Sequence, residues 1–129
     1  MTGQLLDTNA ALIALSDPDR LPGKVRKALL AGPNILSSVS YWEVVIKAMK
    51  GNLNVGDPRA WWSDAVEQLA ATPLPLRPEH VAELSSLPPL HKDPFDRILI
   101  AQAMAEGFAL VTIDSEMRLY ASPRLRIIC

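Results

Sequence analysis

The sequence predicts an α/β protein, a three-layer α/β/α sandwich built on a central parallel sheet. Short apolar runs alternate with longer segments of helical spacing, an order typical of parallel sheets covered by helices on both faces. The chain has 129 residues, 49% of them hydrophobic and 21% charged, which fits one globular domain over residues 1–129. No apolar run approaches the length of a membrane span.

The first half of the chain predicts two strands and four helices. Strands are expected at 3–6 ("GQLL") and 34–39 ("NILSSV"), and helices at 8–16, 21–32, 40–50 and 57–71. Glycines that favour a helix end follow two of these helices, at Gly32 and Gly51. Ser40 and Glu43 have capping-box spacing, and Asp57 precedes a proline suited to the first helical position.

The second half predicts two more strands. A proline-rich bend at 72–78 leads to a helix near 79–87 and to another within 91–103, which Gly107 closes. A β-branched strand follows at 109–113 ("ALVTI"), then a helical turn at 115–120 and a last strand at 125–129. Four parallel strands are therefore expected in all.

The cysteine count and the N-terminus bear on location. Cys129 is the only cysteine, so no internal disulfide can form, and Asp7 interrupts the early apolar stretch where a secretory segment would need a continuous one. Both observations favour the cytoplasm.

Four acidic residues are expected to meet at one edge of the sheet. Ligands of open parallel sheets bind beyond the carboxyl ends of the strands. Asp7 and Asp114 end the first strand and the strand at 109–113, and Glu43 lies at the start of the helix after the second strand. Asp96 begins a helix that runs antiparallel to the following strand, which brings it to the same edge.

Each acid also has a purely structural explanation. Asp7 and Asp114 can cap the helical segments that follow them, and Glu43 can pair with Lys47 one turn later. Asp93 precedes a proline and suits an N-cap, so capping is its expected role. Asp96 differs because it heads the apolar stripe of Leu99, Ile100 and Ala103, which predicts that it faces inward.

Carboxylates gathered in this way need a counter-charge. Two of them about 4 Å apart repel by roughly 4 kcal/mol at an effective dielectric near 20. Such a group takes up protons or holds a cation, and a set made only of oxygen ligands favours Mg²⁺ or Mn²⁺. Ions of this kind in open carboxylate sites serve phosphoryl transfer or phosphodiester hydrolysis.

The motifs around these acids resemble those of a known family. "LLDTNAALIAL", "SSVSYWEVVIKAMKGNL", "HKDPFDRILIAQAMAEG" and "ALVTIDSEM" are similar, in order, to the acidic motifs of PIN-domain ribonucleases, and more specifically of VapC-type toxins of toxin–antitoxin pairs. The resemblance implies a PIN-like sandwich that cuts RNA with Mg²⁺ or Mn²⁺ and is inhibited by a VapB-type antitoxin. It matches the four family acids to Asp7, Glu43, Asp96 and Asp114.

The resemblance also suggests roles. It implies that Asp7, Asp96 and Asp114 hold the metal, while Glu43 orders or deprotonates a water. Thr8, Asn9 and Thr112 are expected to orient these ligands. Relatives with the "DPFDR" motif often carry His two residues after the first acid, where this chain has Asn9.

Candidate partner contacts follow from charge and aromaticity. The net charge is −1, yet with the four site acids set aside the remainder carries +3. Lys47, Lys50 and Arg97 share helices with site acids and are the candidate RNA contacts, whereas Lys24 and Lys27 are interpreted as part of a solvated helix face.

Trp62 heads an expected core stripe with Val66 and Leu69. Trp61 lies about 100° around the helix, either in the same core or on an apolar patch for an antitoxin or a second subunit of a homodimer.

Two other functions compete with this prediction. A haloacid-dehalogenase-like phosphatase would also place an Asp after the first strand, but it needs a second Asp at position 9, which is Asn9. A non-catalytic RNA-binding or regulatory module would tolerate an incomplete acid set, and here the set is complete.

Overall fold

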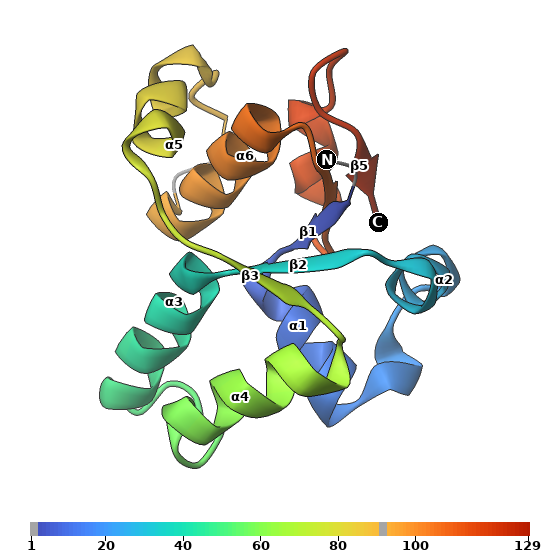
Figure 1. Cartoon of the computed structure of the whole chain (residues 1–129), viewed down its shortest axis with the longest axis vertical. Coiled ribbons are helices and arrows are strands. Elements are labelled where there is room, and N and C mark those ends of the chain that lie inside the picture. The colour runs from blue at the N-terminus through green and yellow to red at the C-terminus, as the bar shows by residue number, and fades with distance from the viewer. Residues whose placement is uncertain (1–2, 91–92) are drawn as a thin grey trace.

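The computed structural model describes residues 3–90 and 93–129 and places five parallel strands at the centre of the molecule. The strands are β1 (Gln4–Leu6), β2 (Asn34–Ser37), β3 (Thr72–Leu74), β4 (Ala109–Val111) and β5 (Ile127–Ile128), in the order β3-β2-β1-β4-β5. Every neighbouring pair is parallel, which confirms the predicted sheet (Figure 1).

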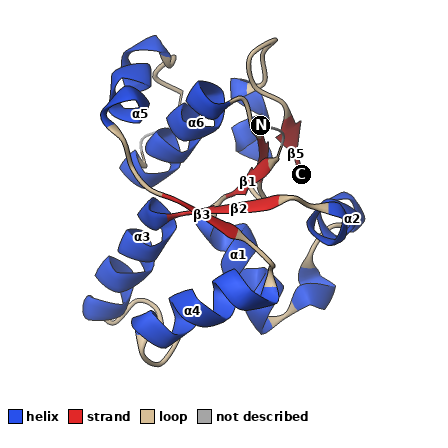
Figure 2. Ribbon diagram, in the orientation of Figure 1, coloured by secondary structure: helices blue, strands red, loops and turns tan. Residues whose placement is uncertain are grey.

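Helices cover both faces of this sheet (Figure 2). They are α1 (Thr8–Ser16), α2 (Gly23–Ala31), α3 (Ser38–Met49), α4 (Pro58–Gln68), α5 (Pro78–Glu83) and α6 (Pro94–Glu106), with short 3₁₀ turns η1 (Pro18–Arg20), η2 (Leu84–Ser86) and η3 (Ser115–Tyr120). In Figure 1, α5 and α6 lie on one side of the strands and α1 and α4 on the other.

The strands divide their side chains between two cores. Leu5 packs into a cluster with residues of α6, whereas its neighbour Leu6 packs into a second cluster with residues of α1 and α4. Leu110 and Val111 of β4 separate in the same way. Successive side chains of a strand point to opposite faces, so two cores on one sheet make the three layers that the sequence predicts.

One strand was missed by the sequence prediction. Residues 72–74, which we expected to belong to a bend, form β3 at the edge of the sheet, with Pro73 opposite Leu36 of β2. Proline lacks the N–H that a central strand would need, and an edge strand tolerates this because one of its sides has no partner strand. The proline-rich composition therefore concealed a strand.

One local prediction was wrong. The helix expected to begin at Ser40 begins at Ser38, because the side chain of Ser37 accepts the hydrogen bond from Val39 N and is the N-cap. On α4 both tryptophans pack in one core: the predicted stripe of Trp62, Val66 and Leu69 is partly buried against the cluster that contains Trp61. Trp61 is only 7% exposed and packs with Ala65 in the core, whereas Trp62 is half-buried and stacks on Tyr41 with ring centroids 5.0 Å apart.

The strand order creates a place for a ligand. The chain builds the sheet outward from β1 through β2 to β3, and then returns to the other side of β1 with β4 and β5. The carboxyl ends of β1 and β4 flank this reversal, which is where open α/β sheets bind ligands. Asp7 and Thr112 immediately follow these two strands. Among the helices of the described residues, none has the length and apolar character needed to span a membrane.

Candidate functional site

Asp7 lies at the centre of the carboxyl edge and is 3% exposed. Its Oδ1 accepts a hydrogen bond from Ala10 N at 2.8 Å, which caps α1, and its Oδ2 accepts one from the Thr112 hydroxyl. Burial raises the pKa of Asp7 to about 6; the hydrogen bonds from Thr112 and Ala10 oppose the rise, and the nearby charges of Glu43 and Asp114 add to it. Asp7 is thus both the N-cap of α1 and a buried carboxylate with acidic neighbours.

Thr112 joins the ends of two neighbouring strands. Its hydroxyl donates to Asp7 and accepts from Asp114 N at 3.0 Å. Asp114 in turn caps η3, because its Oδ1 accepts from Glu116 N at 3.0 Å. The predicted orienting role of Thr112 is consistent with this geometry: one buried hydroxyl fixes Asp7 and the backbone of Asp114 together.

Glu43 is buried on α3 beside a lysine. It is 3% exposed, and its Oε2 lies 2.7 Å from Lys47 Nζ one turn along the helix. Its other oxygen, Oε1, is buried and has no hydrogen-bond partner among the described residues. A carboxylate oxygen that is removed from water without a partner is costly, so this atom needs a proton donor or a cation that residues 3–90 and 93–129 do not supply.

Lys47 links Glu43 to the N-terminus of α6. Burial lowers the pKa of its ammonium, but the hydrogen bond and charge of Glu43, together with the charges of Asp93 and Asp96, outweigh burial and raise the pKa overall. Lys47 therefore lies within the electrostatic reach of three carboxylates on two helices. Of the other predicted RNA contacts, Lys50 is exposed on α3 and Arg97 is half-buried on α6.

Asp93 and Asp96 divide their roles much as the sequence predicts. Asp93 is the N-cap of α6, and its Oδ1 accepts hydrogen bonds from Phe95 N at 2.9 Å and Asp96 N at 3.3 Å. Asp96 lies in the first turn and is half-buried. The charges of Glu43 and Asp114 act on Asp7, and those of Glu43 and Asp96 act on Lys47. That the four acids form one site stays a prediction.

Thr8 and Asn9 have different surroundings. Thr8 is 1% exposed, and its hydroxyl donates to Ser40 Oγ at 3.0 Å, which ties α1 to α3 three residues before Glu43. Ser40, which the capping box led us to place at the helix start, is thus a buried bridging residue. Asn9 is exposed and lines an apolar hollow of about 600 Å³.

Trp61, which the sequence analysis left open between the core and an interface patch, is buried and borders the same hollow. Its burial supports the core alternative of the sequence analysis. Any contact it makes with a partner would be through the edge of its ring that reaches the hollow, beside Leu12 and Ile13 of α1.

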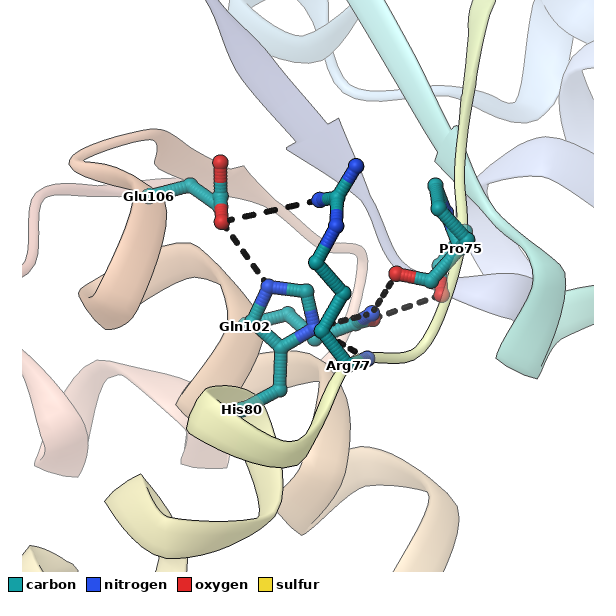
Figure 3. A network of polar contacts seen from close by, with 6 residues as sticks. Pro75, Arg77, His80, Gln102 and Glu106 are labelled. Carbon is teal, nitrogen blue, oxygen red and sulfur yellow. Dashed lines mark hydrogen bonds and ion pairs between the residues drawn. The ribbon is translucent and has the colours of Figure 1, made fainter.

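A buried network of hydrogen bonds joins α5 and α6 to the N-terminus of α3. Gln102 of α6 accepts a hydrogen bond from the hydroxyl of Ser37, the N-cap of α3, at 2.6 Å. His80 of α5 accepts from Arg77 N through Nδ1, so its Nε2 carries the hydrogen that Glu106 accepts at 2.9 Å (Figure 3). The network fixes α5, α6 and the start of α3 together, and with them the helix that carries Glu43. No local sequence pattern predicts this network, because its members lie up to 65 residues apart.

The donor set suits a hard divalent ion. All four acids offer oxygen ligands, one oxygen of Glu43 is buried without a partner among the described residues, and burial, with the charges of Glu43 and Asp114, raises the pKa of Asp7. As the side chains are placed in residues 3–90 and 93–129, no three acidic, histidine or cysteine groups stand close enough together to hold an ion. The fit therefore rests on donor chemistry and electrostatics, and ion binding requires the carboxylates to draw together.

Comparison with known proteins agrees with this arrangement. The curated protein Ribonuclease VapC22 of Mycobacterium tuberculosis is 27% identical over 126 residues, which cover 96% of each chain. In fold, the chain is similar to crystal structures of VapBC2 from Rickettsia felis bound to a DNA fragment from their promoter (TM-score 0.67, 17% identity, 98% of this chain and 97% of that one) and of DNA-bound VapBC from Salmonella typhimurium (TM-score 0.66, 18% identity, the same coverage). The family model of the PIN domain matches residues 5–123. The chain belongs to the PIN domain family.

Proposed function

We propose that this chain is a divalent-metal-dependent endoribonuclease that acts as the toxin of a toxin–antitoxin pair. The observation that carries the proposal is the buried carboxylate of Asp7, whose pKa is raised in part by the charges of Glu43 and Asp114. Asp7 follows β1, and Asp114 follows the neighbouring strand β4. The named relative is a ribonuclease, and the acid set that the family resemblance requires is complete. We assign Mg²⁺ or Mn²⁺ to Asp7, Asp96 and Asp114.

The chain's own residues prepare the site for hydrolysis. A bound divalent ion supplies a water of lowered pKa and neutralises charge that develops on the phosphate. The hydroxyl of Thr112 donates to Asp7 and holds it in place. Asp114 is held by the backbone N–H of Glu116, which donates to its Oδ1. Glu43 Oε1 is the acceptor that we assign to the proton of the attacking water, since it is buried and free of other hydrogen bonds among the described residues.

Lys47 has a role in this scheme that joins structure to substrate. Its ion pair with Glu43 Oε2 holds that side chain in place and leaves Oε1 available. The same ammonium, 38% exposed, can meet a phosphate oxygen of the RNA. Attack by water on phosphorus does not use the 2′-OH and leaves 5′-phosphate and 3′-hydroxyl ends.

The test is cleavage of labelled RNA by the purified protein, with the ends of the products identified by enzymatic ligation. We expect cutting in millimolar Mg²⁺ or Mn²⁺, none in EDTA, and 5′-phosphate ends. Undiminished cutting in EDTA, or products with 2′,3′-cyclic phosphate, would contradict the mechanism. RNA binding without any cleavage would favour the non-catalytic alternative. The phosphatase alternative has no carboxylate at Asn9 to support it.

We also infer that a VapB-type antitoxin inhibits the protein. The structures similar in fold include VapBC complexes, and the apolar hollow lined by Asn9 and Trp61 offers a surface for an apolar segment of such a partner. Co-expression with a small DNA-binding protein encoded next to this chain should yield a stable complex and suppress RNA cleavage.

A homodimer is expected as well, and light scattering tests it. Trp42 and Met49 of α3 are exposed apolar side chains that could meet a second copy.

A further inference from the structure

A basic hollow lies on the far side of β5 from β4, beneath α2. It measures about 530 Å³ and is lined by four cations, two lysines of α2 (Lys24 and Lys27), one arginine of η3 (Arg118) and one that precedes β5 (Arg126). No acidic side chain lines it. The two lysines, interpreted from the sequence as part of a solvated helix face, therefore face two arginines from about a hundred residues further along the chain.

The four cations have no carboxylate partner. Within the described parts of the chain none of them forms an ion pair, whereas Arg26, Arg59, Arg77 and Arg124 each do. Arg118 instead donates from Nε to Cys129 Sγ at 2.8 Å, which holds η3 against the end of β5. Like charges gathered around one hollow repel each other, so an anion bound there would be stabilised by all four.

The hollow adjoins the edge that carries the acids. Thr112, which binds Asp7, donates from its backbone N–H to Ile128 O of β5 at 2.9 Å. Arg118 belongs to the turn that Asp114 caps. From Cys129 at this edge the lining runs back along β5 to Arg126, a length of roughly 10 Å at 3.3 Å per residue. In Figure 1 the C-terminus lies between β5 and α2.

We propose that this basic hollow binds the phosphate backbone of the RNA substrate as it leaves the acidic edge. The inference rests on the proposed ribonuclease function. RNA is favoured over an acidic protein segment because the hollow begins at the carboxyl end of β5, and β5 lies beside β4, the strand that Asp114 follows. It also bears on how a chain of net charge −1 can hold a polyanion, because four of its thirteen lysines and arginines gather around one hollow.

The experiment measures binding of a fluorescent oligouridylate of about 20 nucleotides by anisotropy, across a series of salt concentrations. The background is Asp96→Asn, so that the RNA stays intact. The test variant carries Lys24→Gln and Lys27→Gln. The matched control carries Arg26→Gln and Arg59→Gln, which removes the same charge from two arginines outside the hollow that already have carboxylate partners.

We expect the test variant to bind about tenfold or more weakly at 0.1 M salt, and its slope of log affinity against log salt to fall by about 1.4, at roughly 0.7 for each lost phosphate contact. The control should stay within about twofold of the background protein. Lys24→Arg with Lys27→Arg should keep the affinity, which shows that charge and not packing matters.

Equal affinity of the test variant and the background protein would overturn the basic hollow as an RNA site while leaving the proposed function intact. Equal losses in the test and control variants would overturn it too, because overall charge would then suffice. A background protein that binds no RNA even at low salt would instead overturn the proposed function, and this inference with it.

Discussion

Asp7 shows how one side chain serves structure and chemistry together. Its Oδ1 caps α1 and its Oδ2 accepts from Thr112, so neither oxygen is idle, yet burial still raises its pKa to about 6. The capping role predicted from the sequence is therefore confirmed, but capping alone does not account for the raised pKa of Asp7. A cap alone would not require a carboxylate, since Asn caps a helix as well as Asp does.

This pKa makes the metal-free protein sensitive to pH. The carboxyl of Asp7 titrates near 3.8 in the unfolded chain and near 6 in the folded one, so the folded state binds more protons between these values. Its contribution to stability is present below about pH 4 and is lost as the pH rises through 6. The loss is about 3 kcal/mol, at 1.36 kcal/mol for each unit of pKa.

Asp7→Asn removes that titration. In EDTA, the free energy of unfolding of the variant minus that of the wild type should therefore grow as the pH rises from 4 to 8. Urea denaturation at several pH values measures it, with the exposed residue Asp64→Asn as control. A difference that stays flat with pH would show that Asp7 carries no such penalty.

Asp96 and Asp93 test the division of roles on α6. Asp96→Asn should lower RNA cleavage at least about 100-fold with the fold intact, because even residues that merely support a metal ligand cost 10–100-fold. Asp93→Asn should keep most of the activity, since Asn preserves the cap that Phe95 N and Asp96 N require. Cleavage rates and circular dichroism of both variants decide it. Equal losses would assign Asp93 to the site as well.

At the scale of the element, the periodicity of apolar residues predicted where helices lie better than it predicted which face of a helix is buried. The helix predicted at 8–16 and the turn at 115–120 have the observed bounds. On α4 the choice between two adjacent tryptophans depended on which neighbours the helix meets. Packing against α1 and α3 selects Trp61, and the sequence does not contain that information locally. The strand β3 was missed for a related reason: only its position at the edge makes Pro73 acceptable.

The two tryptophans therefore predict unequal costs. Trp61→Ala empties a core site and should lower the free energy of unfolding by about 3–5 kcal/mol. Trp62→Ala loses a partly exposed ring stacked on Tyr41 and should cost about 2 kcal/mol. Denaturant melts of the two variants measure the difference. A larger loss for Trp62→Ala would restore the stripe that the sequence suggested.

At the scale of the whole molecule, the sheet order does what local patterns cannot. The four acids were predicted to share an edge because parallel strands end at one side of a sheet. The parallel sheet places Asp7 and Asp114 after two neighbouring strands, and the joining of all four acids in one site stays a prediction. The basic hollow was not predictable in this way. Its lysines and arginines come from α2 and from the last elements of the chain, and only the position of β5 beside β4 brings them together.

The last prediction concerns the response of the whole fold to metal. A ligand that binds only the folded state stabilises it by about 2.7 kcal/mol at a hundredfold excess over its dissociation constant. Mg²⁺ should therefore raise the wild-type melting temperature by several degrees over the value in EDTA.

The Asp7→Asn variant should melt at or above the wild-type temperature in EDTA, because it lacks the buried charge, and should lose most of the Mg²⁺ response, because it lacks the ligand. Asp93→Asn is the control and should keep the response. If Mg²⁺ shifts Asp7→Asn as far as the wild type, then Asp7 does not bind the metal, and its raised pKa reflects burial beside Glu43 and Asp114 alone.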